Sequence, residues 1–257
     1  MSLAEQYVAF MTILRKEIRR YLRIWPQTLL PSAITMSLYF VIFGSLIGSR
    51  IGEMGGFSYM QFVVPGLIMM AIVTNSYSNV VSSFFGSKFN HSVEELLVSP
   101  VPNYVILMGY VIGGVTRGLF VALIVTMVSL FFSRLAIHSY FIVIVVVLMT
   151  STLFALAGFI NAVFANSFDD ISIVPTFVLT PLIYLGGVFY SMDLLPDFWA
   201  GVSKLNPLVY VVNAFRYGVL GVSDVSLAFA LGMIGFFTVL AFAYSMHLLN
   251  SGTRLRQ

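Results

Sequence analysis

Six long apolar runs follow one another along the chain, separated by short polar segments. They extend from Pro26 to about Gly48 and then over roughly residues 59–83, 104–133, 139–165, 171–190 and 227–249. A helix rises about 1.5 Å per residue and the hydrocarbon core of a bilayer is about 30 Å thick, so each run is long enough to cross it. The pattern predicts an all-α integral membrane protein with six transmembrane helices, organised as one transmembrane domain over residues 1–257.

A basic amphipathic segment precedes the first run. Over residues 2–25, Arg15, Arg19 and Arg23 fall largely on the side of the helix opposite to the apolar and aromatic side chains. The apolar set is Leu3, Tyr7, Phe10, Met11, Leu14, Ile18, Tyr21, Leu22 and Trp25. Such a helix is typical of the membrane interface, where basic side chains meet anionic lipid. We expect an interfacial helix; the alternative is an ordinary helix that packs against a soluble partner.

One further apolar segment, residues 205–222, is too interrupted to be a span. Asn206, Pro207 and Arg216 break it, and apolar runs of that kind are more often re-entrant or interfacial. We therefore predict that residues 191–226 form outward-facing re-entrant helices before the last span.

Aromatic residues gather in and beside this outer region. Tyr190 and Trp199 belong to a set that is expected at headgroup level as an interfacial belt. The alternative is a lid over the exit path of an amphipathic substrate.

The basic residues outside the runs indicate the orientation, because loops rich in Lys and Arg stay in the cytoplasm. With both termini cytoplasmic, the inner side holds Arg15, Lys16, Arg19, Arg20, Arg23, Lys88, Arg254 and Arg256, and the outer side holds Arg50, Arg134, Lys204 and Arg216. The inner excess predicts cytoplasmic termini. The same parity places the polar segments 87–103 and 166–170 in the cytoplasm.

The first of these cytoplasmic segments contains a short helix. Ser92 and Glu95 have the spacing of a capping box, and the prolines at 100 and 102 cannot continue a helix, which confines it to about residues 93–98. The helix offers Leu96, Leu97 and Val98 beside Glu94 and Glu95, and Pro100 follows it. A short capped helix suits docking into a groove of another protein; the alternative is a loop that covers the ends of two spans.

Residues 59–118, which include SVEELLVSPVPN, and residues 168–218, which include FDDISIVPTF and LNPLVYVVNAFRYG, resemble the membrane subunit of type-2 ABC transporters. The similarity is greatest to YadH-like permeases of the bacterial inner membrane and covers nearly the whole chain. It implies six spans, an interfacial N-terminal helix, and a coupling helix at residues 92–103 that contacts a soluble ABC ATPase. By this resemblance, the residues at that contact are Glu94, Glu95, Leu96, Leu97 and Pro100.

A second contact with the ATPase is one reading of Asp169 and Asp170, which follow the fourth run. The other is that these carboxylates cap the fifth helix, since acidic groups favour helix N-termini.

Several residues inside the runs are unusual for a membrane helix. Arg117 is either a paired charge within the membrane or, if its helix extends into the cytoplasm, close to the inner headgroups. Gly113, Gly114 and Gly118 continue a GxxxG pattern that lets helices approach closely, within the subunit or at a dimer or conduit face. Two prolines, at 175 and 181, interrupt the fifth run as a static kink or a bending gate, and we name them Pro175 and Pro181 as candidates.

Nothing in the sequence predicts chemistry on the chain itself. A P-loop needs Gly-Lys, and the three lysines follow Arg15, Ser87 and Ser203, so ATP and Mg²⁺ are expected on a partner subunit. The three histidines lie far apart, and cysteine is absent, so we expect no enzyme, no metal and no cofactor on this chain.

Composition agrees with this interpretation. Hydrophobic residues make up 59% of the chain and charged ones 9%, and most of the net charge of +3 lies near the termini, which indicates topology and no nucleic-acid partner. We expect a permease subunit of an ATP-driven exporter in a bacterial inner membrane, forming a dimer with a second copy and binding two ATPase subunits. The expected substrate is amphipathic, a lipid or a glycan. A non-transporting anchor or sensor for an ATPase, or an ion-coupled carrier, is the alternative.

Overall fold

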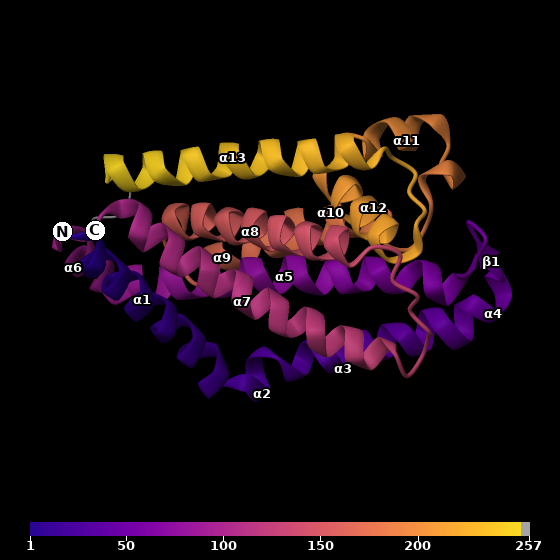
Figure 1. The fold of residues 1–257 in the computed structure, drawn as a ribbon, viewed down its shortest axis with the longest axis horizontal. Coiled ribbons are helices and arrows are strands. Elements are labelled where there is room, and N and C mark those ends of the chain that lie inside the picture. Colours follow the sequence, from indigo (N-terminus) through magenta and orange to yellow (C-terminus); the bar gives the residue numbers. More distant parts are fainter. Residues whose placement is uncertain (253–257) are drawn as a thin grey trace.

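A computed structural model describes residues 1–252, which are mostly helical (Figure 1). Arg254 and Arg256, used above for the orientation, lie outside the described residues. The elements up to the third long helix are α1 (Leu3–Arg23), α2 (Trp25–Thr28), α3 (Leu30–Tyr39), the π-helix η1 (Phe40–Ile47), α4 (Gly48–Ile51), β1 (Glu53–Met54), β2 (Phe57–Ser58), α5 (Tyr59–Phe89), α6 (Ser92–Val98) and α7 (Asn103–Ser129). The remaining elements are α8 (Tyr140–Phe164), α9 (Asp170–Ile173), the π-helix η2 (Val174–Leu179), α10 (Thr180–Tyr184), the 3-10 helix η3 (Met192–Leu194), α11 (Asp197–Ser203), α12 (Pro207–Leu220) and α13 (Leu227–Ser251).

Five helical segments are long and apolar enough to cross a membrane, which confirms the prediction of an all-α membrane protein. They are Trp25–Ile51, Tyr59–Phe89, Asn103–Ser129, Tyr140–Phe164 and Leu227–Ser251. The predicted fifth run, residues 171–190, forms a shorter helix, Asp170–Tyr184, than the roughly 20 residues of a straight span. It ends early because the chain turns after Tyr184 and reaches Gly187, whose φ of 74° does not continue a helix.

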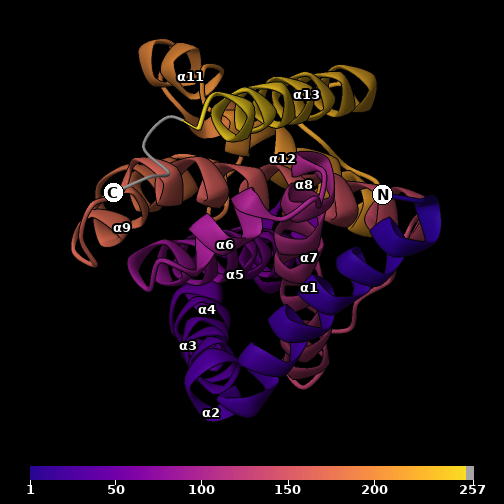
Figure 2. The same cartoon turned by 90° about the vertical axis from the view of Figure 1, so that its left-hand side faces the viewer.

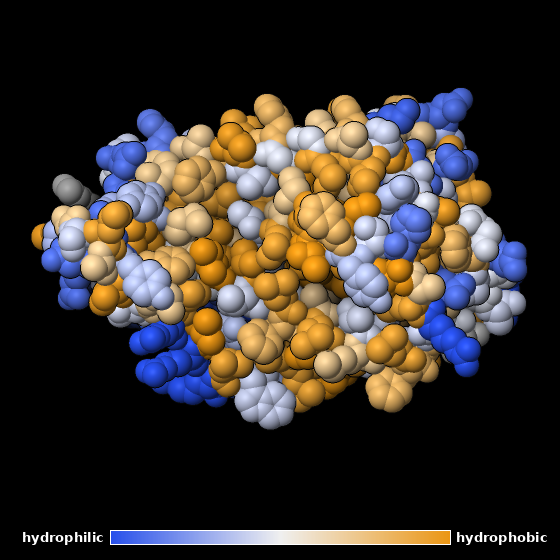
Figure 3. All heavy atoms as spheres, in the orientation of Figure 1, coloured by the Kyte–Doolittle hydropathy of each residue, from blue (hydrophilic) through white to orange (hydrophobic). Residues whose placement is uncertain are grey.

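The ends of the helices form two separate groups. The start of α1, α6 and the end of α13 lie at one end of the molecule, whereas β1, α4 and α11 lie at the other (Figure 1). On the face shown in Figure 3, hydrophobic side chains cover the middle and hydrophilic ones gather toward both ends. This face therefore has an apolar middle zone between two polar ends.

The α5 helix is the central column of this bundle. In the view from the α6 end it lies between α7, α8 and the segment α3–α4 (Figure 2). Of its most apolar window 78% is buried, compared with 12% for Trp25–Ile51 and 11% for Leu227–Ser251. Burial inside the chain therefore holds α5, whereas the first segment and α13 expose most of their apolar surface.

Glycines set how closely the helices approach α5 and α1. The glycines of α7 face two different helices. A Cβ on Gly113 would lie 2.6 Å from Cβ of Glu17 on α1, and one on Gly114 would lie 2.6 Å from the side chain of Val80 on α5. A Cβ on Gly118 would overlap Ser76 of α5. All three glycines thus contact helices of the same chain.

Replacing Gly158 of α8 by alanine tests this close approach. The new Cβ would lie 2.5 Å from the backbone carbonyl oxygen of Tyr77, which cannot move without shifting α5. We expect a loss of about 1–3 kcal/mol in stability, measured as a lower melting temperature of the purified protein in detergent. The control is Gly86→Ala on α5, where a Cβ meets nothing within 4 Å. Equal melting temperatures for both variants would contradict the prediction.

Candidate functional site

The short helix α6 projects from the end of α5. Val93 is buried and anchors it, whereas the side chains of Glu95, Val98 and Pro100 are exposed, Val98 by 85%. Glu94 is half-buried, as are the adjacent Leu96 and Leu97, which pack against the core. The outward surface of α6 is therefore an acidic and apolar strip along one short helix.

The predicted capping box at the start of α6 is wrong. His91 precedes the helix in the left-handed region with φ of 57°, and the Ser92 hydroxyl donates backward to the carbonyl oxygen of Ser87 at 3.0 Å. The tight turn after α5 already places Ser92 inside the helix, so its hydroxyl does not reach the first free N–H groups. Glu94 instead lies 3.3 Å from Nδ1 of His91.

A buried lysine fixes the base of α6. Lys88, in the last turn of α5, donates from Nζ to the carbonyl oxygens of Val163 and Ala165, both at 2.8 Å. These carbonyls end α8, where a cation satisfies free acceptors and complements the helix dipole. The ends of α5 and α8 therefore form one joined base beneath α6.

The loop 166–170 continues this base. Phe168 contacts the rings of Phe85 and Phe89, each with a centroid distance of 5.0 Å. Asp170 accepts from the backbone N–H groups of Asn166 (2.8 Å) and Ser167 (3.2 Å), and the Ser167 hydroxyl accepts from the N–H of Asp170.

The two predicted aspartates therefore differ in what they do. The Asp170 carboxylate closes the turn that opens the apolar helix Asp170–Tyr184. The side chain of Asp169 is exposed and makes no capping hydrogen bond.

A row of polar side chains on α5, absent from the sequence predictions, binds α1 and α7. We call Asn75, Asn79, Ser83 and Ser87 the polar ladder; their spacing of four places them on one face of the helix. The partners are Arg117 for Asn75, Arg20 for Asn79, Glu17 for Ser83, and both Lys16 and Tyr110 for Ser87. Regular polar residues in an apolar helix are the signal that could have revealed it.

The buried face of α1 carries a charge, which the amphipathic pattern did not predict. Ile13, Glu17 and Tyr21 are its buried residues, while the predicted apolar residues Tyr7 and Trp25 are 63% and 54% exposed. The rest of the chain thus covers one face of α1 and leaves apolar side chains on another face exposed.

Arg117 turns into the interior of the subunit. It donates from Nη2 to the carbonyl oxygen of Thr28 and to Oδ1 of Asn75, both at 3.1 Å. Thr28 is the last residue of α2, near the start of the apolar segment Trp25–Ile51, and α3 begins at Leu30. Arg117 therefore ties this break in the chain to α5.

At the opposite end, a second buried arginine holds the outer segments. Arg216 is fully buried in α12, donates to the carbonyl oxygen of Gly187 at 2.6 Å, and lies 3.8 Å from the ring centroid of Phe62. Asn206 caps α12 through the N–H of Leu208, with Pro207 as the first helical residue.

The other predicted residues of the outer half are dispersed. Tyr190 is half-buried with no partner for its hydroxyl among residues 1–252, and Trp199 is 49% exposed beside Phe198. Pro175 lies in η2, where Thr180 donates to its carbonyl oxygen at 2.8 Å, and Pro181 lies in α10. The structure does not bring these four residues into one site.

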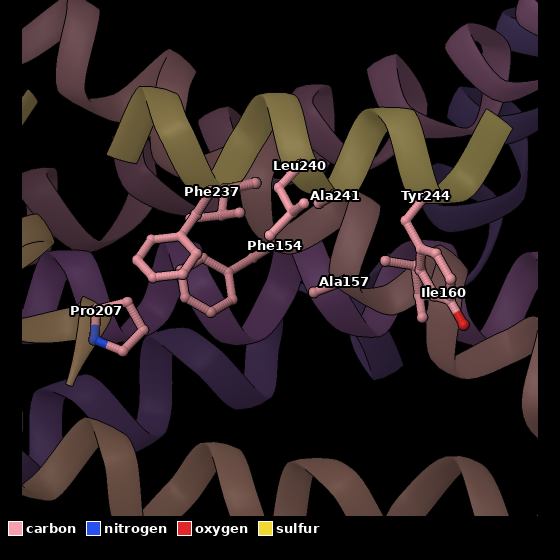
Figure 4. A pocket seen from close by; sticks show the side chains of 9 residues that line it. Phe154, Ala157, Ile160, Pro207, Phe237, Leu240, Ala241 and Tyr244 are labelled. Carbon is pink, nitrogen blue, oxygen red and sulfur yellow. The ribbon is translucent and has the colours of Figure 1, made fainter. Parts of the chain in front are cut away.

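An apolar groove of about 520 Å³ lies between parts of α8 and α13 (Figure 4). Phe154, Ala157 and Ile160 line one wall, and Phe237, Leu240, Ala241 and Tyr244 line the other, with Pro207 at one end. No charged side chain lines it, so it suits a hydrocarbon group. Within residues 1–252, no group of three or more His, Cys, Asp or Glu is placed to hold a metal.

Known proteins resemble this chain over most of its length. The family described as ABC-2 type transporter matches residues 8–220. The inner membrane transport permease YadH of Escherichia coli K12 is 59% identical over 250 residues, which are 97% of this chain and 98% of that protein. Nodulation protein J of Neorhizobium galegae is 22% identical over 242 residues, 94% of this chain and 92% of that protein. These matches include α6 and the loop 166–170.

Replacing Lys88 by methionine tests the joined base. The carbonyls of Val163 and Ala165 would lose their charged donor, at a cost of about 1–3 kcal/mol. We expect faster amide hydrogen exchange over residues 160–170, measured by mass spectrometry. The control, Lys204→Met, changes an exposed lysine before α12 and is expected to leave that exchange unchanged. Parent-like exchange in Lys88→Met would show that the lysine does not hold the base.

Proposed function

This chain belongs to the ABC-2 type transporter family, and on that premise we propose that it is the permease subunit of an ATP-driven exporter. In such a transporter the chain pairs with an ABC ATPase. A bacterial inner membrane is the expected location, in keeping with the printed name of its 59% identical relative.

The observation that carries the proposal is how α6 is attached to the joined ends of α5 and α8. Its exposed side chains lie at the end of a base made rigid by Lys88, so a force on α6 reaches both α5 and α8. Glu94, Glu95, Leu96, Leu97 and Pro100 form the proposed contact with the ATPase, with Asp169 of the adjacent loop at its edge. ATP and Mg²⁺ belong to that partner, because no Gly-Lys pair exists in this sequence.

We further propose six crossings with both termini in the cytoplasm. The α8 helix ends at the base of α6, and α11 lies at the opposite end, so Asp170–Tyr184 and the turn after it make the fifth crossing (Figure 1). Residues 191–226, with η3, α11 and α12, then form the outer re-entrant region before α13.

A second copy of the chain is part of the proposal. The first apolar segment and α13 bury only 12% and 11% of their apolar windows, which leaves faces for lipid and for a partner subunit. Two ATPases would then bind the two α6 helices. The wholly apolar groove between α8 and α13 supports an amphipathic substrate over a strongly polar one.

The orientation can be tested by thiol labelling, because the chain has no cysteine. Glu53→Cys and Glu95→Cys place single exposed thiols at opposite ends of the molecule. In spheroplasts, a membrane-impermeant maleimide is expected to label position 53 at once and position 95 only after detergent is added. The reverse order would overturn the proposed orientation.

The contact with the ATPase can be tested by changing only exposed residues of α6. Glu95→Lys combined with Val98→Asp reverses one charge and introduces another without touching the buried Val93. We expect the tagged parent, purified in mild detergent, to retain an ATPase partner, identified by mass spectrometry, and the variant to lose at least nine-tenths of it.

The matched control is Glu53→Lys combined with Ile51→Asp, the same chemistry at the opposite end. It should retain the partner. Equal recovery of an ATPase with all three proteins would place the contact elsewhere, and no ATPase with the parent would oppose the proposal itself.

A further inference from the structure

The polar ladder begins at α6 and binds α1 at its first step. Ser92 of α6 donates to the carbonyl oxygen of Ser87, whose hydroxyl in turn accepts from Tyr110 (3.0 Å) and Lys16 (3.4 Å). The residue that anchors α6 to α5 therefore also receives a cation from α1.

Glu17 occupies the centre of this contact. It is the only fully buried carboxylate among residues 1–252. Its Oε1 accepts from the Ser83 hydroxyl at 2.6 Å, and its Oε2 lies 3.4 Å from Nη2 of Arg20. Gly113 of α7 leaves the space for this approach, because a Cβ there would collide with Glu17.

Holding two helices together through a buried charge costs the free energy of removing that charge from water. An apolar side chain would bury against α5 and α7 without the desolvation cost of a carboxylate. What the carboxylate adds is direction, since its oxygens fix the position of α1 along α5 and around its own axis. Glu17 therefore defines the position and rotation of α1 relative to α5.

The far end of the ladder reaches the first apolar segment. Arg117 binds Asn75 and the carbonyl oxygen of Thr28, and the Thr28 hydroxyl donates to the carbonyl oxygen of Tyr21 in α1 at 2.9 Å. Thr28 lies near the start of the segment Trp25–Ile51, whose most apolar window is only 12% buried. A shift of α1 would therefore move the start of a segment of which the chain itself buries little.

We propose that Glu17 is a positioning residue that fixes α1 to α5, so that a displacement of α6 carries α1 and the start of the first apolar segment with it. This rests on the proposed function, in which α6 receives the force of the ATPase. The ladder gives that force a path to the first apolar segment in addition to the direct path along α5.

The test uses spin labels in the chain's cysteine-free background. Arg19→Cys on α1 and Glu95→Cys on α6 are exposed sites. The protein is placed in nanodiscs with unlabelled protein in excess, so that each labelled pair lies within one subunit. Pulsed electron–electron double resonance then gives the distribution of distances between the two labels. We expect Glu17→Ala to widen this distribution at least twofold, and Ser83→Ala to widen it while keeping the carboxylate.

Two further variants calibrate the result. Glu17→Gln still accepts from Ser83 but cannot pair with Arg20, so an intermediate width is expected. Glu5→Gln changes the other acid of α1, which is exposed and bonds only within its own cap, and should match the parent.

The complex with the ATPase supplies a readout that loss of stability alone would not change. The distances from α6 and from α1 are each measured to a reference label at Lys204→Cys, an exposed site of the outer region that lies outside the first apolar segment. In the parent, ATP should shift both distances. In Glu17→Ala the α6 shift should remain and the α1 shift should disappear.

Parent-like widths in Glu17→Ala and Ser83→Ala, or an unchanged α1 shift with ATP, would overturn the positioning role. If the parent binds no ATPase, the proposed function fails on that ground, and the widths measured on the permease alone still decide whether Glu17 fixes α1 to α5.

Discussion

Polar side chains on a buried membrane helix must find their partners inside the protein, because hydrocarbon offers no hydrogen bond. The α5 helix places four such side chains in the most buried part of the fold, and each has a partner from α1 or α7. This requirement locates α1, whose Glu17 and Arg20 must reach Ser83 and Asn79. The glycines of α7 then follow as a consequence, since they leave room for α1 to lie that close.

The same principle operates at both ends of the bundle, where backbone leaves regular helices. Lys88 binds the carbonyls that end α8, and Arg216 binds the carbonyl of Gly187 in the turn after α10. Each cation joins an irregular segment to a central helix. The structure therefore contains a firmly joined core of α5, α7 and α8, with less buried helices around it.

This division between core and periphery suits a transporter subunit. The α6 helix stands on the joined core, while the first apolar segment and α13 have large exposed apolar faces. A rigid element that receives force and loosely held helices that respond to it are what coupling to an ATPase requires. The groove between α8 and α13 lies between the joined core and one of these less buried helices.

Local pattern determined much of this protein from the sequence alone. The apolar runs predicted the five long spans, and the position of Pro100 and Pro102 predicted where α6 ends, because length, apolarity and proline act on their own segment. Local pattern did not fix the capping of α6, which depends on the turn at His91, or the early end of the helix Asp170–Tyr184. Tertiary structure alone decided the role of Glu17, whose partner Ser83 is 66 positions away, and that of Lys88, whose acceptors are 75 and 77 positions away. Partners so distant meet only when the helices pack, so no periodicity within either segment records them.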